Sequence, residues 1–417
     1  MPAVAAREHV EKAFMDPVHG FIIVRRRWLL DLIDTPEFQR LRRIRQLGSS
    51  FGTYHGAEHT RFGHSLGALH IMERILQRLQ EANGRPDEET VAVALAAALL
   101  HDVGHAPFSH ALEYLLTPDT GHEQWTRRVL LEDTGITRVL RTVDGSLPEK
   151  VADVLAGRSQ PAWVSRLVSS QLDVDRMDYL LRDALFTGAE YGRFQLERII
   201  HTLVLHGDQP AVQAKGINAI EEYVLARHFM YWRVYLHKTV RGAEMLLRAA
   251  LRRARQLGEL PEPKTVEEYL ALDDADILVA LKRWTRHADP VLSDLSRRYL
   301  ARRLLKPVFS VPPAELPPGA VEAAREVVAR AGFDPDSYCL VDPMSNVPYT
   351  PYVPPHDGAE GSWQPILVLT AEGRLAEISK LSPLIQALAG RTVRAVNVYV
   401  PEECRAAVRA AISSLAE

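Results

Sequence analysis

Five ionisable side chains crowd the segment LLHDVGHAPFSHALE, which begins at Leu99 and overlaps the end of an apolar run, Val91–Leu100. They are His101, Asp102, His105, His110 and Glu113. The run predicts a helix buried on all sides, with His101 and Asp102 at its inner end. A buried, unpaired carboxylate is costly unless a cation compensates it, although polar caps on a helix end are the ordinary alternative. Imidazole and carboxylate ligands suit Mn, Fe, Zn, Ni or Co, or Mg when water fills most positions.

Two other segments carry side chains that can complete a metal site. His64 lies at the start of an amphipathic stretch in EHTRFGHSLGALH, and QLDVDRMDYLLRD contains Asp173, Asp175, Asp178 and Asp183. Each segment alone also fits a core histidine or a solvated acidic helix face. Because neighbouring residues on a helix point about 100° apart, His101 and Asp102 need such segments to close a coordination shell.

The order of these residues, H…HD…D, resembles the HD-domain metal-dependent phosphohydrolases. The likeness extends to one branch, the deoxynucleoside triphosphate triphosphohydrolases, which includes bacterial dGTPase-like enzymes and enzymes that couple a sterile alpha motif to an HD domain. Six segments carry it in order: DPVHGFI, IDTPEFQRLRRIRQLG, GAEHTRFGHSLG, LLHDVGHAPFSHALE, DVDRMDYLLRD and YLHKTV. The resemblance covers Asp16 to Leu304 well and the tail more loosely.

The resemblance implies roles for particular residues. The divalent metal (Mn, Mg, Fe, Zn, Ni or Co) would be held by His64, His101, Asp102 and Asp175. The catalytic group beside it would be His110, Glu113, His122 and His105. Substrate would be bound by Arg61, Gln46, Leu47, Asp173, Arg176, Tyr179, Asp183, Arg227, Tyr235 and Lys238. In this set Gln46, Tyr179 and Asp183 would read the sugar 3′-hydroxyl, and Tyr235 would exclude ribose.

The same resemblance implies regulation by a guanine nucleotide in a homodimer or homotetramer. The guanine nucleotide would contact Asp34, Gln39 and Arg42, and a second activator site would be formed by Arg198, Arg233, His237 and Lys238. An ordinary structural explanation competes with it, because Asp34 can cap the turn before Pro36 and Arg42 can lie on a solvated helix face.

The reaction implied is hydrolysis of deoxynucleoside triphosphates to deoxynucleoside and inorganic triphosphate, by attack of water at the α-phosphorus. A broader HD-type nucleotidase or phosphohydrolase, using the same ligands, is the alternative within the superfamily. A non-catalytic nucleotide sensor is the alternative outside catalysis. Two basic stretches, RVLRTV and LRRARQLG, are short and lack interleaved aromatic residues, which disfavours a nucleic-acid-binding module.

The elements that must position these residues are mostly helices. Helical periodicity covers Leu66–Ala82, Glu88–Leu100, His110–Leu116, Trp163–Leu181, Ala219–Leu257 and Thr265–Leu304. After the proline-rich stretch Val311–Ala320 and one more helix, Val321–Ala331, short β-branched runs (CLVDP, PILVLT, VRAVNVYV) predict strands, and Glu402–Leu415 predicts a closing helix. We therefore expect a mostly α fold: a helical HD phosphohydrolase domain with an N-terminal extension over residues 1–305, and a smaller α+β domain over residues 306–417.

Composition narrows the setting. The chain has 417 residues, a formal charge of −3 and 47% hydrophobic residues, as in an ordinary globular protein with no global attraction to nucleic acid or anionic lipid. Two cysteines, Cys339 and Cys404, cannot form a disulfide framework. The ten-residue run Val91–Leu100 is too short to span a bilayer, and the charged N-terminus lacks a signal segment, so we expect a cytoplasmic protein.

Overall fold

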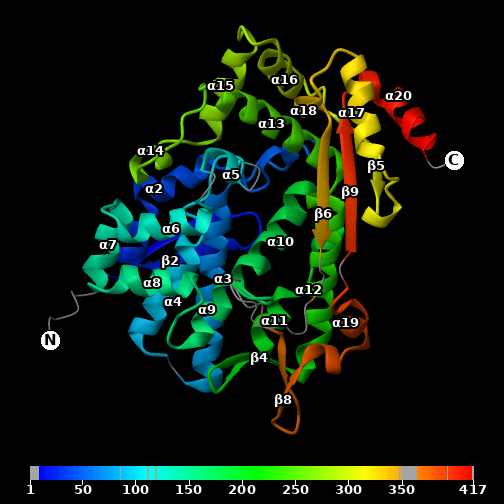
Figure 1. Ribbon diagram of the computed structural model, residues 1–417. Helices are drawn as coiled ribbons and strands as arrows, with labels where there is room; N and C mark the ends of the chain where they lie inside the picture. The colour runs from blue at the N-terminus through cyan, green and yellow to red at the C-terminus, as the bar shows by residue number, and fades with distance from the viewer. Residues whose placement is uncertain are drawn as a thin grey trace.

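The computed structural model describes residues 9–84, 86–109, 112–117, 120–346, 349, 364–391 and 393–415. It is mostly helical, as the sequence predicts, with small sheets at the N-terminus and in the C-terminal part (Figure 1). The helices are α1 (Arg27–Ile33), α2 (Pro36–Gln39), α3 (Arg61–Asn83), α4 (Glu88–Leu100), α5 (Glu113–Leu116), α6 (His122–Leu131), α7 (Gly135–Val143), α8 (Leu147–Leu155), α9 (Ala162–Val168), α10 (Val174–Thr187), α11 (Leu196–Thr202), α12 (Ile217–Met230), α13 (Lys238–Gln256), α14 (Val266–Leu270), α15 (Asp274–Trp284), α16 (Pro290–Leu300), α17 (Ala320–Arg330), α18 (Pro335–Tyr338), α19 (Pro383–Leu388) and α20 (Glu402–Ser413).

Three helices form the centre of the helical part. Helix α3 packs against both α4 and α10, so the segments that carry His64, His101 and Asp175 become neighbours (Figure 1). The prediction that α4 is buried all round is confirmed, because every residue from Ala92 to Leu100 is buried. Asp87 starts this helix as its N-cap, accepting a hydrogen bond from the Thr90 backbone N–H at 2.7 Å.

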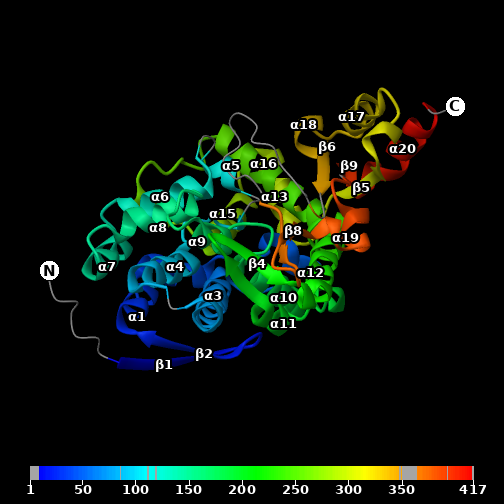
Figure 2. The ribbon, with the colours of Figure 1, turned by 90° about the horizontal axis from the view of Figure 1, so that it is seen from below.

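The N-terminal extension contains an antiparallel hairpin that the sequence reading did not anticipate. Its strands are β1 (His9–Asp16) and β2 (Gly20–Arg26), and β2 packs on α1 and α3 along one side of the molecule (Figure 2). Ile22 and Val24 alternate into the core at 1% and 2% exposure, which is the spacing of a half-buried strand. The turn is closed by Asp16, whose Oδ1 accepts from the backbone N–H groups of Val18 and His19.

Three of the stretches with helical periodicity are helical, and each divides into more than one helix. The stretch Trp163–Leu181 breaks between α9 and α10, where Asp173 caps the second helix. Ala219–Leu257 breaks at a π-helical turn, Tyr231–Tyr235, before His237 caps α13. Thr265–Leu304 divides into three helices whose N-caps are Thr265, Asp273 and Asp289. Apolar periodicity continues across these capping residues, so periodicity alone merges the helices.

Seven further short strands follow the hairpin among the described residues, two of them before residue 305 and five after it. The strands are β3 (Leu203–His206), β4 (Gln209–Gln213), β5 (Lys306–Val311), β6 (Leu340–Asn346), β7 (Leu367–Leu369), β8 (Leu375–Glu377) and β9 (Val393–Val400). They form two sheets, ordered β3-β4-β7-β8 and β5-β9-β6. Strand β7 pairs in parallel with β4, with Val368 opposite Val212, so one sheet contains strands from both sides of the proposed boundary at residue 305. A single cluster of buried apolar residues runs from Ile22 to Ile412, and the boundary itself stays a prediction.

Cys339 and Cys404 are free and buried. Among the described residues, no helix combines the length and the apolar character that crossing a membrane would require.

Candidate metal and nucleotide site

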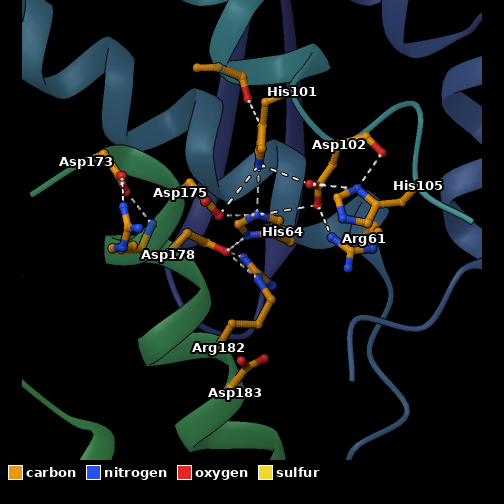
Figure 3. Close-up of polar contacts among 12 residues, drawn as sticks. Arg61, His64, His101, Asp102, His105, Asp173, Asp175, Asp178, Arg182 and Asp183 are labelled. Atoms are coloured by element: carbon orange, nitrogen blue, oxygen red, sulfur yellow. Dashed lines mark hydrogen bonds and ion pairs between the residues drawn. The ribbon is translucent and has the colours of Figure 1, made fainter. Parts of the chain in front are cut away.

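The predicted metal ligands come together where α3, α4 and α10 meet (Figure 3). His64 lies in the first turn of α3, His101 caps the C-terminal end of α4, and Asp175 lies in the first turn of α10. One candidate ligand atom from each lies within 4.8 Å of the others. His64 Nε2 is 3.0 Å from His101 Nε2 and 3.1 Å from Asp175 Oδ1. The His64 side chain is fully buried, whereas that of Asp175 is 35% exposed, so the cluster reaches the surface on the Asp175 side.

Asp102 lies at the edge of the same cluster. Its Oδ2 is 3.6 Å from His64 Nε2, and its Oδ1 is 3.5 Å from His101 Nε2. Arg61 donates from Nη1 to Oδ2 at 2.6 Å, and His105 Nδ1 lies 3.1 Å from Oδ1. The carboxylate therefore faces two imidazoles on one side and a guanidinium on the other, which fits a metal ligand held in place by Arg61.

The hydrogen bond made by Nδ1 of each imidazole determines whether its Nε2 is free to bind a metal. His64 Nδ1 lies 2.8 Å from Asp178 Oδ2, and His101 Nδ1 lies 2.9 Å from the Ala98 carbonyl oxygen. Ionised carboxylate and carbonyl oxygens only accept, so each Nδ1 carries the proton and donates. In the neutral rings both Nε2 atoms then present lone pairs to one another, an arrangement that a shared cation relieves. This donor set fits a divalent metal.

The charges around His64 and His101 also favour a positive charge between these two imidazoles. Burial disfavours the imidazolium form of His64, but hydrogen bonds to Asp175 and Asp178 and the charge of Asp102 outweigh it and raise the pKa of His64 to about 10. Burial likewise opposes the charged form of His101, and the carboxylates of Asp102 and Asp175 outweigh it and raise its pKa. A metal ion would take the place that a proton otherwise occupies.

The group that the resemblance placed beside the metal is only partly described. His110 lies outside the described residues, as does the side chain of Glu113, whose backbone begins α5. His122 begins α6, and its ring packs on that of His105 with centroids 4.1 Å apart. Burial and the charge of Arg61 hold the pKa of His105 well below its usual value, so His105 is a neutral donor to Asp102.

Residues that the resemblance assigns to sugar recognition form a second cluster, Asp183, Tyr235 and His59, farther along α10, with His59 joining it from outside that assignment. Tyr235 donates to Asp183 Oδ2 at 2.7 Å, and His59 Nε2 lies 2.7 Å from Asp183 Oδ1. Burial and the nearby Asp183 carboxylate raise the pKa of Tyr235 well above its usual value, which keeps the phenol a donor. The ring of Tyr179 lies between the two clusters, 6.4 Å from the His64 ring and 6.3 Å from the Tyr235 ring.

The other predicted substrate residues are more dispersed. Asp173 caps α10 and pairs with Arg176, and Arg227 lies over the Tyr231 ring at 5.1 Å. The Gln46 backbone N–H donates to the His59 carbonyl oxygen at 3.0 Å, which places Gln46 beside the Asp183 cluster. Leu47 is half-buried, and Lys238 is exposed at the start of α13.

The predicted activator residues fall in three places. Gln39 accepts from Arg42 at 2.8 Å, and Asp34 is exposed nearby at the end of α1. Arg198, on α11, donates to the Lys215 carbonyl oxygen. Arg233 packs on Tyr191 and Phe229, and His237 caps α13. Among the described residues, no hydrogen bond, ion pair or ring contact joins these three groups within one chain.

Sequence reasoning missed the residues that support the metal cluster. In the sequence Asp178 is one member of an acidic run, and no metal-ligand motif marks His19, Arg182 or His59. The signal for Asp178 was its place three residues after Asp175, which puts both carboxylates on neighbouring parts of one helix face.

Comparisons with known proteins agree with this geometry. The HD domain family matches residues 61–183, and the family described as HD associated region matches residues 194–416. The chain is 40% identical to the "uncharacterized protein YwfO" of Bacillus subtilis over 94% of this chain and 93% of that protein. It is 28% identical to the deoxynucleoside triphosphate triphosphohydrolase SAMHD1 homolog of Dictyostelium discoideum, over 63% of this chain and 54% of that protein.

Solved structures give the same result. A phosphohydrolase from Bacteroides thetaiotaomicron superposes with a TM-score of 0.82 at 30% identity, covering 94% of this chain and 100% of that chain. The two family matches, the solved phosphohydrolase structure and the cluster of His and Asp residues agree with one another. The chain therefore belongs to the HD-domain phosphohydrolase superfamily, whose members depend on a metal.

Proposed function

We propose that this protein hydrolyses deoxynucleoside triphosphates to deoxynucleoside and inorganic triphosphate, by attack of water at the α-phosphorus. One observation carries the proposal: Asp175, Tyr179 and Asp183 follow one another at four-residue intervals on α10. They therefore share one helix face, with Asp175 beside His64 and His101, and Asp183 beside Tyr235 and His59, about 12 Å apart along the axis. The names of the Dictyostelium discoideum and Gallus gallus relatives, both deoxynucleoside triphosphate triphosphohydrolases, support this substrate class.

In this proposal His64, His101, Asp102 and Asp175 hold a divalent metal. When bound, the metal supplies Lewis-acid polarisation of a phosphate and a water nucleophile near neutral pH. Arg61 holds Asp102 in place through Nη1 and donates from Nε to Ser109 Oγ at 2.9 Å, so its fork is anchored beside the phosphate position. His110, Glu113 and His122, with His105, form the proposed acid and base group.

The sugar is proposed to bind at the other end of α10. Asp183 is held by Tyr235 and His59, and its carboxylate can accept a further hydrogen bond from the 3′-hydroxyl. Gln46 Oε1 is buried without a hydrogen-bond partner among the described residues, and a sugar hydroxyl can supply that partner. The remaining proposed substrate residues are Leu47, Asp173, Tyr179, Arg176, Arg227 and Lys238.

Activation by dGTP or GTP in a homodimer or homotetramer is a further part of this proposal. The Asp34 carboxylate can accept from guanine N1–H and N2–H, and it is exposed. Among the described residues no hydrogen bond, ion pair or ring contact joins the three groups of predicted activator residues, and we propose that more than one subunit contributes to the activator site.

Product analysis tests the proposal. Purified protein is incubated with each dNTP and Mn²⁺ or Mg²⁺, with and without GTP, and the products are identified. Nucleoside together with inorganic triphosphate is the expected result. Stepwise release of orthophosphate would indicate the broader nucleotidase instead, and binding of dNTP without turnover would indicate a sensor. A turnover rate unchanged by GTP, in a protein that sediments as a monomer, would overturn the activation proposal alone.

A further inference from the structure

Asp178 lies next to His64, on the side away from the other candidate metal ligands, and is fully buried (Figure 3). Its Oδ2 accepts from His64 Nδ1 at 2.8 Å and from Arg182 Nε at 2.8 Å. Its Oδ1 accepts from His19 Nε2 at 2.7 Å and from Arg182 Nη2 at 2.9 Å. Burial opposes ionisation of Asp178, but Arg182, His19 and His64 hold its pKa well below the usual value, so all four contacts are donated to a carboxylate.

These four hydrogen bonds leave the carboxylate one orientation. Each oxygen accepts one bond from the Arg182 fork and one from an imidazole, so a rotation that keeps one imidazole would lose the other. Helix α3 adds a steric limit, because a Cβ placed on Gly67 would lie 1.8 Å from Asp178 Oδ1. Gly67 therefore allows the carboxylate to lie against the same helix that carries His64.

His19 reaches this position from outside the helical core. It belongs to the turn between β1 and β2, and its backbone N–H donates to Asp16 Oδ1 at 3.0 Å. Asp16 in turn accepts from Arg182 Nη1 on its Oδ2 at 2.8 Å. The hairpin turn is thus fixed to α10 at two points, through Asp16 to Arg182 and through His19 to Asp178.

We infer that His19 is a positioning residue for the metal site, acting through Asp178 on His64. The inference rests on the proposed metal-dependent function and goes beyond it by assigning a role to the N-terminal hairpin. His19 holds Asp178 Oδ1, which leaves Oδ2 directed at His64 Nδ1. That contact keeps the proton on Nδ1 and the lone pair of Nε2 toward the metal. Without the His19 N–H, Oδ1 keeps only its hydrogen bond from Arg182 Nη2. The carboxylate is then held less firmly, and so are the tautomer and ring orientation of His64 that depend on it.

A cavity next to His19 makes the inference testable by chemical rescue. It has a volume of about 600 Å³ and is lined by His19, Arg74, Leu181, Phe194 and His201, among others. An imidazole molecule is small enough to enter it and to replace a deleted His19 ring. His201 lines the same cavity, and no hydrogen bond or ion pair to Asp178 is found for it among the described residues, so it offers a matched control.

The experiment compares full-length wild type with His19→Phe, His19→Gln, His19→Gly and the control His201→Gly. Binding of Co²⁺ is measured by titration of its visible absorption, which reports ligand geometry without substrate. We expect His19→Phe to weaken Co²⁺ affinity about tenfold, at the lower end of the range for outer partners of metal ligands. His19→Gln, which restores an N–H donor, should recover most of the affinity and the wild-type spectrum.

Rescue gives the second readout. Imidazole should restore Co²⁺ affinity in His19→Gly and leave wild type and His201→Gly unchanged. The inference is overturned if His19→Phe binds Co²⁺ with wild-type affinity and spectrum. It is also overturned if His19→Gln and His19→Phe lose the same Co²⁺ affinity and imidazole does not restore the Co²⁺ affinity of His19→Gly. The His19 ring would then contribute packing alone. Failure of wild type to bind any divalent metal would instead remove the proposed function.

Discussion

Arg61 donates from Nη1 to Asp102 Oδ2 at 2.6 Å, and both side chains are nearly inaccessible to solvent, at 5% and 6% exposure. Asp102 therefore has a permanent cation, Arg61, on one side and the imidazoles of His64 and His101 on the other, and His105 Nδ1 lies 3.1 Å from its Oδ1. Arg61 keeps the carboxylate ionised and near the metal position without occupying it. The pair explains how a buried carboxylate persists in this protein before a metal binds.

Replacement of Asp102 should separate metal binding from folding. We expect Asp102→Asn, which keeps the side-chain volume, to lower metal affinity by more than about 100-fold and to abolish turnover, because the metal loses an anionic ligand. Metal content after gel filtration and the metal-induced rise in melting temperature measure this directly.

The matched control for this variant is Asp31→Asn, on the exposed face of α1, where the carboxylate pairs with Arg27. It should retain metal and activity. If Asp102→Asn kept its metal, Asp102 would be a partner of Arg61 and not a ligand.

The sequence predicted the structure best where ionisable residues directly follow a fully apolar run. The helix predicted over Glu88–Leu100 is present with the same bounds, and His101 and Asp102 lie at its inner end as expected. The predicted ligand segments also meet. Their meeting was inferred from resemblance to a family, because spacing alone does not show that α3 and α10 pack together.

The hydrogen bonds that hold the candidate metal ligands in place could not be predicted in the same way. Asp178 and Arg182 stand four apart on a helix, which in a sequence reads as an ordinary surface ion pair. Only the tertiary structure brings His19, 159 positions away in sequence, onto the same carboxylate. The hairpin of β3 and β4 was missed although LVLHGDQPAV carries a glycine-containing turn between two short apolar runs, which is a recognisable hairpin signal.

A second prediction concerns Gly67. Alanine in place of an interior helical glycine usually stabilises a protein by about 0.5–1 kcal/mol. Here the added Cβ would lie 1.8 Å from Asp178 Oδ1 and 2.6 Å from Arg182 Nη2, so the carboxylate must move. We expect Gly67→Ala to lower the free energy of unfolding by about 1–3 kcal/mol and to weaken metal binding together with it. Denaturant unfolding and Co²⁺ titration measure the two effects.

Gly145→Ala is the control for Gly67→Ala, because nothing lies within 4 Å of a Cβ at that position. It should leave both quantities near the wild-type values. A Gly67→Ala protein more stable than wild type would show that Asp178 has room to move.

A third prediction separates the two parts of Tyr235. Tyr235→Phe removes the 2.7 Å hydrogen bond to Asp183 and keeps the ring. A hydrogen bond to a charged group contributes about 1.5–3 kcal/mol, so we expect the KM for dNTP to rise roughly tenfold or more while the preference over ribonucleotides remains. Tyr235→Ala should also lose that preference, because it removes the ring that we propose crowds the 2′ position. Steady-state kinetics with dGTP and GTP measure both effects. If both variants lost the preference for dGTP equally, the hydroxyl and the ring of Tyr235 would not have separate roles.

The last prediction concerns acid stability and His70. Burial, with smaller contributions from His19 and Arg74, outweighs the attraction of Asp16 and Asp178 and lowers the pKa of His70 to about 4. The unfolded chain, with a histidine pKa near 6.5, therefore binds a proton between pH 6.5 and pH 4 that the folded protein does not. His70 then makes no difference above pH 6.5 and progressively destabilises the fold as the pH falls toward 4, by roughly 1–2 kcal/mol after allowance for its partial exposure. His70→Gln should remove this part of the pH dependence, so the unfolding free energies of wild type and variant diverge in acid and run parallel above pH 7. Denaturant unfolding at several pH values between 4.5 and 8 measures the difference, and curves that stay parallel throughout would show that His70 protonates equally well in both states.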